Sequence, residues 1–390
     1  FFQSNLFTLY HFYTDTSCMK RKWIRRVGWI LLTPIILFVI LMVLLYIPPV
    51  QNLLRREVTA YASKATGMQI QVERIDLRFP LNLLVRGVEV IQQPDTLLSL
   101  ESLNVRVQAW PLLKGKVEVD EVTLSQVAVN SANLIEGMQI KGVSGRFFLQ
   151  SHGVDLSNET AVVNRTELSD THIQLLMTDT TTTPKDTTAS APVNWKVNLH
   201  QLKLKNVSFG MKLPADSMKM AAYIGEATID DAKADLKNQF YGLKQFLLSG
   251  ASASYDTGEA QPSEGFDASH MAVRNIRIGL DSLLYEGRNM NAVIREITME
   301  ERSGLSITSL TGRLFSNDSI IRIPELKLQT PHSEIDLSAQ TYWELVNIPT
   351  TGRLSASFNA HIGKEDVMLF AGGLPQTFKE AYPFLSLIHI

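Results

Sequence analysis

From residue 68 onward, apolar and polar residues alternate along most of the chain. Ile70 and Val72 are each flanked by polar residues, and after a step of two residues the alternation resumes at Ile75 and continues to Val85. A period of two places successive side chains on opposite faces of a strand. The pattern therefore predicts strands with one apolar and one polar face, and it returns at 98–107, 117–129, 197–209, 273–278, 320–328 and 354–362.

Several of these runs share a phase shift, in which apolar-x-apolar is followed by two residues and then by apolar-x-apolar again. Residues 117–124 and 202–209 are examples. Each two-residue step predicts a bulge or a corner where the strand turns within the sheet. Because such units recur, we expect a mainly β fold, an elongated and curved β-sheet groove built of repeat-like antiparallel strands. A set of β-sandwich domains is the alternative.

A different pattern precedes the strands. Residues 27–47 carry no charge, and about 20 such residues in a helix cross a hydrocarbon core of about 30 Å. Five basic residues lie within 20–26, so the positive-inside rule predicts a single-pass signal anchor with the N-terminus in the cytoplasm and the body on the other side. A cleavable signal peptide is the alternative, but its apolar core is usually only about 7–15 residues long.

A short amphipathic helix is predicted directly after the anchor. Between residues 50 and 66, apolar residues such as Leu53, Leu54, Val58 and Tyr61 recur at steps of three and four. Gly67 follows as a C-terminal stop, because glycine readily adopts the left-handed conformation that ends many helices.

These patterns divide the chain into successive segments. We interpret 1–18 as a non-native upstream segment ahead of a true start at Met19, and 385–390 as a non-native, truncated end. The interpretation of 226–244 is left open between strand and helix. The segments between the two ends are a basic cytoplasmic tail (19–26), the transmembrane signal anchor (27–47), the amphipathic helix (50–66), a first β-groove segment (68–177), a Thr-rich flexible loop (178–192) and a second β-groove segment (193–384).

Charge and cysteine content narrow the chemistry. From Val27 onward there are 32 basic and 38 acidic residues (37 − 5 and 39 − 1), a net charge of −6, which argues against nucleic acid as a partner. The only cysteine, Cys18, lies in the segment read as non-native, so the body offers no disulfide, thiolate metal site or cysteine nucleophile.

No catalytic motif is recognisable. The eight histidines are scattered, and neither a phosphate-binding loop nor a nucleophile elbow is present. The carboxylate pairs Asp230–Asp231 and Glu365–Asp366 are interpreted as solvated turn charges and not as an acid/base couple. Neighbours in a strand point to opposite faces, so the two carboxylates of a pair would not converge on one substrate. We therefore expect no enzymatic activity, no catalytic residue, no cofactor and no metal.

The apolar face of such a sheet needs a cover. Few later helices are predicted, so a curved sheet that folds its apolar face inward as a trough is expected. Acyl chains in that trough would gain about 0.8 kcal/mol for each buried CH₂ group. The candidate groove-lining residues are Ile70, Val72, Ile75, Leu77, Phe79, Leu81, Leu83, Val85, Leu103, Val105, Val107, Val117 and Val119.

The N-terminal part resembles a known family. After the anchor, ATGMQIQVERIDLRFPLNLLVRGVEV and LLSLESLNVRVQAWPLLKGKVEVDEVTLSQVAVN are similar to the start of the AsmA-like superfamily, and within it to the TamB family, the inner-membrane subunits of the translocation and assembly module. The resemblance covers 19–130 and extends to about residue 363 only in the style of the repeats.

The resemblance implies a function. It implies a periplasmic β-groove that carries phospholipid from the inner towards the outer membrane in outer-membrane biogenesis, with membrane lipids as partners and no catalytic residues. It also implies an outer-membrane barrel partner, bound through a C-terminal domain that this sequence does not match. A non-catalytic scaffold or chaperone for outer-membrane protein assembly is the alternative.

Overall fold

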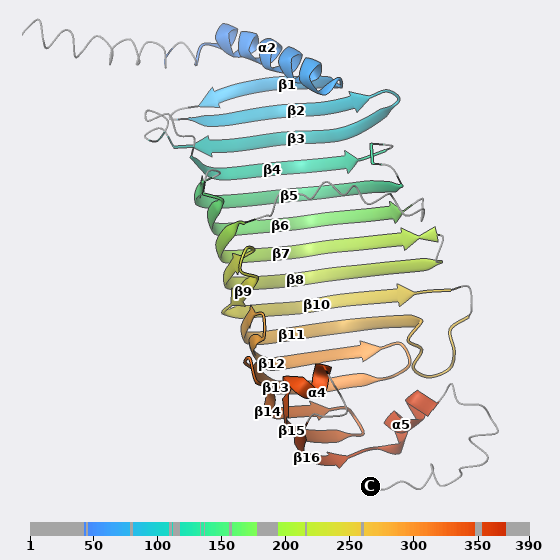
Figure 1. Cartoon of the computed structure of the whole chain (residues 1–390). Coiled ribbons are helices and arrows are strands. Elements are labelled where there is room, and N and C mark those ends of the chain that lie inside the picture. Colours follow the sequence, from blue (N-terminus) through green and yellow to red (C-terminus); the bar gives the residue numbers. More distant parts are fainter. Residues whose placement is uncertain are drawn as a thin grey trace, which may run out of the picture.

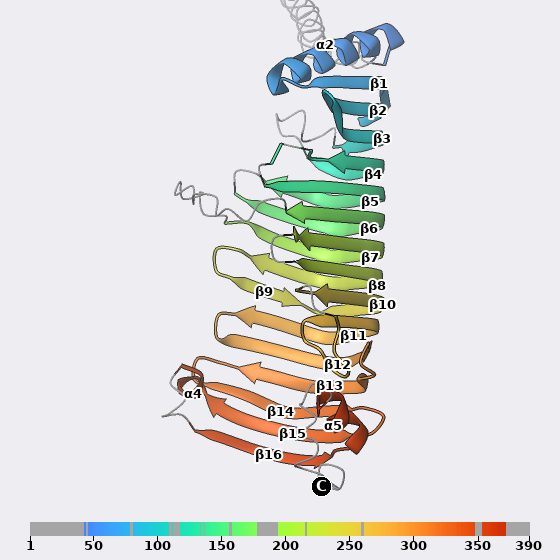
Figure 2. The ribbon, with the colours of Figure 1, turned by 90° about the vertical axis from the view of Figure 1, so that its right-hand side faces the viewer.

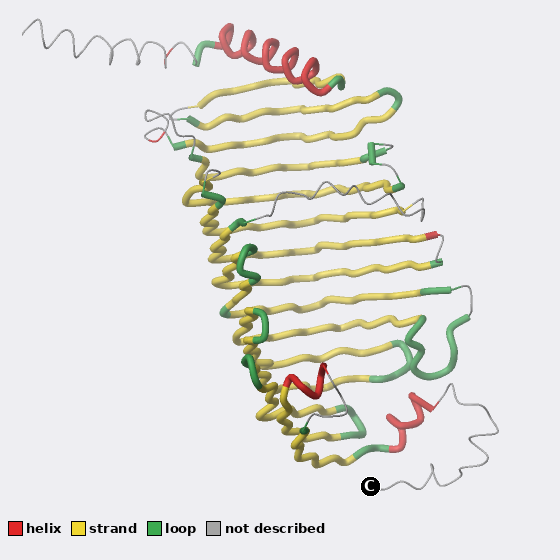
Figure 3. The backbone as a smooth tube through the Cα atoms, viewed as in Figure 1, coloured by secondary structure: helices red, strands yellow, loops and turns green. Residues whose placement is uncertain are grey.

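The computed structural model describes residues 43, 46–78, 81–108, 111, 118–132, 134–135, 137–155, 158–177, 194–214, 217–258, 261–347 and 353–371. Within them, the chain forms one sheet of 16 strands, which confirms the mainly β fold (Figure 1). Figure 3 shows that the helices lie near the two ends of this sheet. None of the helices in these ranges is long and apolar enough to cross a membrane. The predicted anchor at 27–47 lies almost entirely outside the described residues.

The elements follow one another in a simple order. The helices are α2 (Pro48–Thr66), α4 (Trp343–Asn347) and α5 (Lys364–Ala371). The strands are β1 (Gln69–Arg78), β2 (Asn82–Gln92), β3 (Asp95–Val107), β4 (Val119–Asn130), β5 (Met138–Asp155), β6 (Thr160–Met177), β7 (Lys196–Leu213), β8 (Met218–Asp235), β9 (Phe240–Leu243), β10 (Gln245–Asp256), β11 (His270–Glu286), β12 (Asn289–Glu301), β13 (Ser306–Ser316), β14 (Ile320–Gln329), β15 (Glu334–Tyr342) and β16 (Leu354–His361).

Successive strands are neighbours throughout, except that the short strand β9 pairs beside the main path with β8 and β11. All pairs are antiparallel but one, because β6 and β7 run parallel over nearly their whole length. The expectation of antiparallel strands only is wrong at this pair. Parallel neighbours need a crossover of a dozen or more residues, and 18 residues separate Met177 from Lys196. The predicted loop at 178–192 falls in this connection and lies outside the described residues.

Two predictions made from the alternation are resolved by the pairing. The run from Ile75 to Val85 is not one strand, because Ile75 pairs with Val85 and Leu77 with Leu83 across a hairpin. These four apolar residues all have odd numbers and lie on one face. The alternation of the sequence therefore continues through the turn unchanged and does not reveal it. The open interpretation of 226–244 is settled as strand: β8 continues to Asp235 and β9 follows after a short turn.

The helix predicted at 50–66 is confirmed. It begins at Pro48 and ends at Thr66, and Gly67 follows in the left-handed conformation with φ 70°. The Gly67 N–H donates to the Ser63 carbonyl oxygen at 3.0 Å. This bond satisfies one of the carbonyl groups that a helix end leaves without a partner.

The predicted phase shifts are corners and bulges. From β1 to β10, apart from β9, the pairing is interrupted near the middle of each strand, and the interruptions line up at Glu73, Gly87, Glu101, Gln126, Gly145, Asp170, Asn206, Gly225 and Gly250. Five of these residues have positive φ, namely Gly87, Gln126, Asp170, Asn206 and Gly250. A second interruption in β6, β7 and β8 lies at Asn164, His200 and Asp231. At 117–124 the shift is instead a bulge, because Arg106 pairs with Glu121 but Val107 with Val119.

The aligned positions form a bend that runs across the sheet. Figures 1 and 2 differ by a quarter turn and both show long stretches of strand side-on, because each strand has two arms that meet at this bend. The first arm comprises 74–78, 82–86, 102–107, 119–125, 146–155, 160–169, 196–205, 226–235 and 245–249. The second comprises 69–72, 88–92, 95–100, 127–130, 138–144, 171–177, 207–213, 218–224 and 251–256.

Burial identifies the inside of the bend. Residues that flank the bend on the apolar face are buried, for example Leu100, Thr171, Ala227 and Ala251, whose exposed fractions are 6%, 5%, 4% and 5%. Bend residues such as Asp170 are exposed. The apolar face therefore lies on the inside of the bend, and we call this bent sheet the trough.

Candidate functional site

An unbroken row of apolar side chains follows the first arm through the whole trough. Each member pairs directly with the next, so all of them lie on one face. This first row consists of Ile75, Val85, Leu103, Leu124, Phe147, Leu168, Leu204, Ala227, Leu248, Ile278, Ile297, Leu310, Leu328, Ile335 and Ala360. It contains no polar residue from β1 to β16.

A second row runs beside the first, two residues further from the bend in every strand except β12, where a bulge makes the step three residues. It is interrupted only by Thr166 and Gly312. Its members are Leu77, Leu83, Val105, Val122, Leu149, Thr166, Leu202, Ile229, Phe246, Leu280, Ile294, Gly312, Leu326, Leu337 and Phe358. Two parallel apolar rows make a continuous strip along the inside of the trough.

The opposite face of the same arm has the reverse character. The residues next to the first row on the outside pair with one another as Arg74, Arg86, Ser102, Ser125, Arg146, Ser169, Lys205, Glu226 and Ser249. All of them are polar or charged. Beside the bend, an apolar inside row and a polar outside row are therefore maintained over nine neighbouring strands, while Leu84, Phe148 and Leu247 lie further out on the outside.

On the second arm, the inside apolar side chains are partly open to solvent. Val129, Phe209 and Met220 are 40%, 39% and 38% exposed. Val129 and Phe209 belong to one cross-strand row, through Gly142 and Ile173. Exposed apolar side chains in a contiguous concave strip are typical of a binding surface.

Most of the predicted groove residues lie on the inside. Ile75, Val85 and Leu103 belong to the first row, and Leu77, Leu83 and Val105 to the second. Ile70 and Val72 lie on the second arm. The remaining candidates lie at strand ends or beyond the described residues: Leu81 is buried just before β2, Val107 pairs with Val119, and neither Phe79 nor Val117 is described.

The sequence prediction missed the inside residues of seven strands, β5, β6, β8, β10, β12, β13 and β15. In β6 the alternation is obscured by polar inside residues, since Thr166 and Thr171 occupy apolar positions. A usable signal is present in the same strand, because Leu168 and Thr171 are separated by the two-residue step that marks the bend elsewhere.

A hollow of about 1070 Å³ lies along the second arm between β5 and β12. Most of its lining residues alternate with the inside apolar ones, for example the cross-strand row His172, Ser208, Tyr223 and Ser252. His172 Nδ1 lies 2.6 Å from Ser208 Oγ. The inside residues Phe209, Met211 and Met220 line it as well, whereas no member of the first or second row does, so the hollow belongs to the second arm and is separate from the strip on the first arm.

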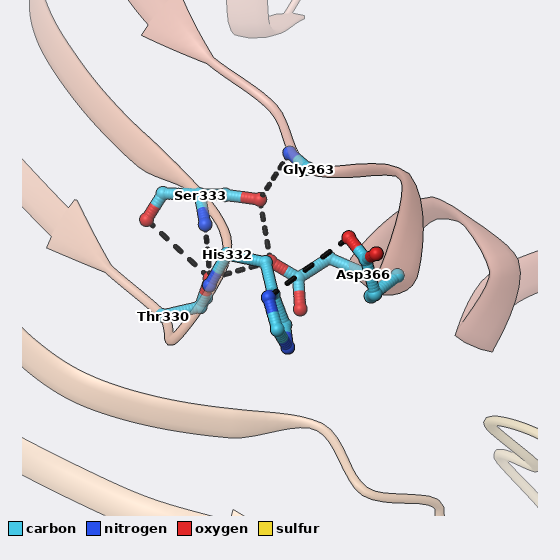
Figure 4. A network of polar contacts seen from close by, with 6 residues as sticks. Thr330, His332, Ser333, Gly363 and Asp366 are labelled. Atoms are coloured by element: carbon cyan, nitrogen blue, oxygen red, sulfur yellow. Dashed lines mark hydrogen bonds and ion pairs between the residues drawn. The ribbon is translucent and has the colours of Figure 1, made fainter. Parts of the chain in front are cut away.

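A buried polar network joins the last strands to α5 (Figure 4). The hydroxyl groups of Thr330 and Ser333 both donate to Asp366 Oδ2, the latter at 2.5 Å. The Gly363 N–H donates to Ser333 Oγ at 3.0 Å. Asp366 is only 8% exposed, so its interpretation as a solvated turn charge is wrong: the carboxylate is buried because it holds the β14–β15 turn against the start of α5.

This network lacks the geometry of a nucleophilic site. The Ser333 hydroxyl is bonded to a carboxylate, while His332 Nδ1 lies 3.9 Å from Glu365 on the exposed side. A serine nucleophile needs an adjacent base such as histidine to take its proton. The arrangement is that of a structural contact between the β14–β15 turn and the start of α5.

The other carboxylate pair is divided between two sets of partners. Asp230 accepts a hydrogen bond from Gln201 Nε2 at 3.1 Å. Asp231 contacts His200 and Lys244, and the hydrogen bond from His200, with a smaller contribution from Lys244, holds the pKa of Asp231 below its ordinary value. Among the described residues, no group of three or more His, Cys, Asp or Glu side chains could hold a metal ion.

The loop between β10 and β11 is organised around Asp267. The backbone N–H groups of Ser263 and Ser269 donate to its carboxylate at 3.0 and 2.9 Å. These bonds, with one from His270, hold the pKa of Asp267 far below its ordinary value. Phe266 in the same loop packs on Phe370 of α5, with ring centroids 5.3 Å apart.

Comparison with known proteins gives no family for this trough. No family model matches the chain, and no curated protein matches it. The resemblance to the AsmA-like superfamily stays a prediction.

Proposed function

We propose that this chain is a non-catalytic carrier that shields phospholipid acyl chains inside its trough and passes them from the inner towards the outer membrane. The observation that carries the proposal is the first row, which continues without a polar interruption across every strand from β1 to β16 except the lateral strand β9. An acyl chain has no hydrogen-bonding groups, so a row of side chains without hydrogen-bonding groups can contact it along its whole length.

The dimensions favour a conduit over a single binding pocket. The 15 strands of the paired path, spaced by about 4.8 Å, give the trough a length of about 67 Å. This is roughly twice the hydrocarbon thickness of a bilayer, about 30 Å. Each acyl CH₂ group that leaves water gains about 0.8 kcal/mol, so lipid would remain in the strip while it moves between equivalent positions.

The proposal places headgroups and acyl chains in different surroundings. The apolar strip would cover the acyl chains, and the opening between the two arms would leave the headgroup in water. No residue needs to react with the lipid, which is why we propose a role without catalysis or a cofactor. The alternation alone would maintain the path.

The proposed location follows from the sequence. The uncharged run at 27–47 and the basic tail before it would anchor the chain in the inner membrane by a single span, with the trough in the periplasm. Membrane lipids would be the cargo. We further propose that an outer-membrane barrel partner binds a domain beyond this sequence, as the resemblance to the TamB family implies.

A second candidate function is supported by the last strand. β16 pairs only with β15 among the described strands, and its residues Leu354 and Phe358 are 60% and 61% exposed. An open edge with exposed apolar side chains can accept another strand. The chain would then act as a scaffold or chaperone that pairs with strands of outer-membrane proteins.

Site-specific photo-crosslinking distinguishes the two functions. A benzophenone amino acid at Leu83, Val105 or Leu248 should capture phospholipid in membranes. The control is Leu247, which has the same side chain as Leu248 but faces outside between Thr228 and Gly279. Capture at Leu247 as strong as at Leu248 would contradict the carrier.

The strand edge is tested in the same experiment. A benzophenone at Ser355 or Ser357 of β16 should give no protein adduct if the carrier proposal is right. Protein adducts at β16 together with no lipid at the three inside positions would establish the scaffold instead.

A further inference from the structure

Helix α2 lies along the free edge of β1 and presents polar side chains to it. Gln51 Nε2 donates to the Leu77 carbonyl oxygen at 3.2 Å, and Arg55 Nη1 donates to the Glu73 carbonyl oxygen at 2.6 Å. The Ile70 N–H in turn donates to Ser63 Oγ at 3.0 Å. These bonds satisfy backbone groups that an edge strand otherwise leaves open.

The apolar side of α2 faces away from the protein. Leu53, Val58 and Tyr61 are 59%, 52% and 77% exposed, and Ala65 is exposed as well. At 100° per residue, these side chains fall within an arc of about 140°. Arg55 and Ser63, which contact β1, lie outside this arc on the other side of the helix, and Gln51 lies beside Val58 at its margin. A helix on a soluble protein normally turns this stripe towards the core, so α2 has the reverse orientation.

The position of α2 in the chain indicates what covers the stripe. The uncharged run at 27–47 ends at Ile47, and α2 begins at the next residue, Pro48. Ile47 is extended, with φ −79° and ψ 127°, so the helical conformation of α2 does not continue through this residue. A helix that begins where a membrane-spanning run ends begins at the membrane surface.

The charges of α2 suit the same surroundings. Arg56 and Lys64 are exposed and form no ion pair with any described residue. Basic side chains beside an apolar stripe are typical of helices that lie in the interface of membranes with anionic lipids. Lys64 and Glu57 lie within the arc itself, between Leu53 and Tyr61, which restricts α2 to a shallow depth where both charges reach water.

We propose that α2 lies flat in the interface of the bilayer, with the stripe of Leu53, Val58, Tyr61 and Ala65 in the boundary between headgroups and acyl chains. Figure 1 shows α2 lying along β1, across one end of the sheet. The strands then run parallel to the membrane plane, and the stack of strands extends away from the bilayer. The first row of the trough begins in β1, directly beneath the membrane surface.

The proposal is tested with nitroxide labels on the full chain. In a Cys18→Ser background, single substitutions Leu53→Cys, Val58→Cys and Tyr61→Cys are labelled and reconstituted in vesicles of phosphatidylethanolamine and phosphatidylglycerol. The control is Tyr223→Cys on β8, whose parent side chain is 40% exposed and distant from α2 in the chain. All four parent side chains are exposed, so the labels do not disturb packing.

The readout is the relative accessibility of each label to oxygen, which concentrates in the bilayer, and to a water-soluble nickel chelate. We expect oxygen to relax the labels at 53, 58 and 61 more strongly than the chelate does, and the opposite at 223. Water-like accessibility at the three α2 positions would overturn the proposal. This result is independent of lipid transport, because α2 can lie in the interface whether or not the photo-crosslinkers in the trough capture lipid.

Discussion

A charge placed in the middle of the apolar strip should block the trough without unfolding it. Leu248 lies in the first row between Ala227 and Ile278. Its neighbour Leu247 lies on the outside between Thr228 and Gly279, where the Arg295 guanidinium covers the glycine. Both leucines are half-buried. Leu248→Asp and Leu247→Asp therefore make the same chemical change on the two faces of one strand.

The expected magnitude follows from the cost of a carboxylate among acyl chains. A charge without a partner in apolar surroundings costs several kcal/mol. The carboxyl group avoids this cost by taking up a proton. Its ordinary pKa lies roughly three units below pH 7, and each unit costs about 1.36 kcal/mol, so protonation at pH 7 costs about 4 kcal/mol. This sets an upper limit of about 1,000-fold on the loss of lipid occupancy at Leu248, since 1.4 kcal/mol is tenfold.

The assay uses position-resolved capture of phospholipid. A benzophenone at Leu204 reports lipid on the α2 side of the substitution, and one at Leu310 reports lipid beyond it. If lipid enters at the α2 end, Leu248→Asp should reduce capture at 310 at least tenfold and leave capture at 204 nearly unchanged. Leu247→Asp should change neither. Equal effects of the two variants, or capture at 310 that survives Leu248→Asp, would refute the reasoning.

Three further predictions concern stability, measured by circular dichroism of the full chain in detergent unless stated. Gly225→Ala should lower the free energy of unfolding by about 1–3 kcal/mol, because the new Cβ would lie 2.9 Å from the Gly250 carbonyl oxygen. In the control variant Gly210→Ala, the new Cβ has no neighbour closer than 4.0 Å, so this substitution should be neutral or stabilising. Equal effects of the two substitutions would exclude a steric cause. Asp366→Ala should cost about 1–3 kcal/mol by leaving the buried Ser333 hydroxyl and the half-buried Thr330 hydroxyl without their acceptor, and an unchanged unfolding temperature would contradict this. The pKa of Asp267 is lowered in the fold, so the stability that its carboxylate contributes is present above the ordinary pKa of aspartate and is lost as the pH falls through and below that value. Between pH 5 and 3, amide hydrogen exchange at 261–269 should therefore accelerate more in the parent protein than in the Asp267→Asn variant.

Local physical chemistry made part of this fold predictable from the sequence. The period of two fixes which residues share a face within one strand, and it assigned Ile75, Val85 and Leu103 to one face, where the strand pairing also joins them. The end of α2 at Gly67 follows from the conformational freedom of glycine, whose φ of 70° other residues adopt rarely. The two-residue steps at Glu73 and Asn206 indicated the bend because a strand that turns there must shift its phase to keep its apolar face inside.

Other features depend on which strand lies beside which. The hairpin between Leu77 and Leu83 is invisible to the alternation, because pairing of odd-numbered with odd-numbered residues leaves the pattern unchanged across the turn. The parallel pair of β6 and β7 leaves no trace in the period either, since both directions alternate equally. Burial of Asp366 depends on two hydroxyl groups that lie more than 30 residues away in the chain.

The apolar strip itself combines both kinds of information. The sequence by itself determined that many strands have one apolar face, because alternation is a property of neighbouring residues. It could not determine that fifteen such faces align edge to edge, because a slip of one residue between any two strands would turn the apolar side chains of the next strand outside. Only the register set by the tertiary structure joins separate faces into one continuous path.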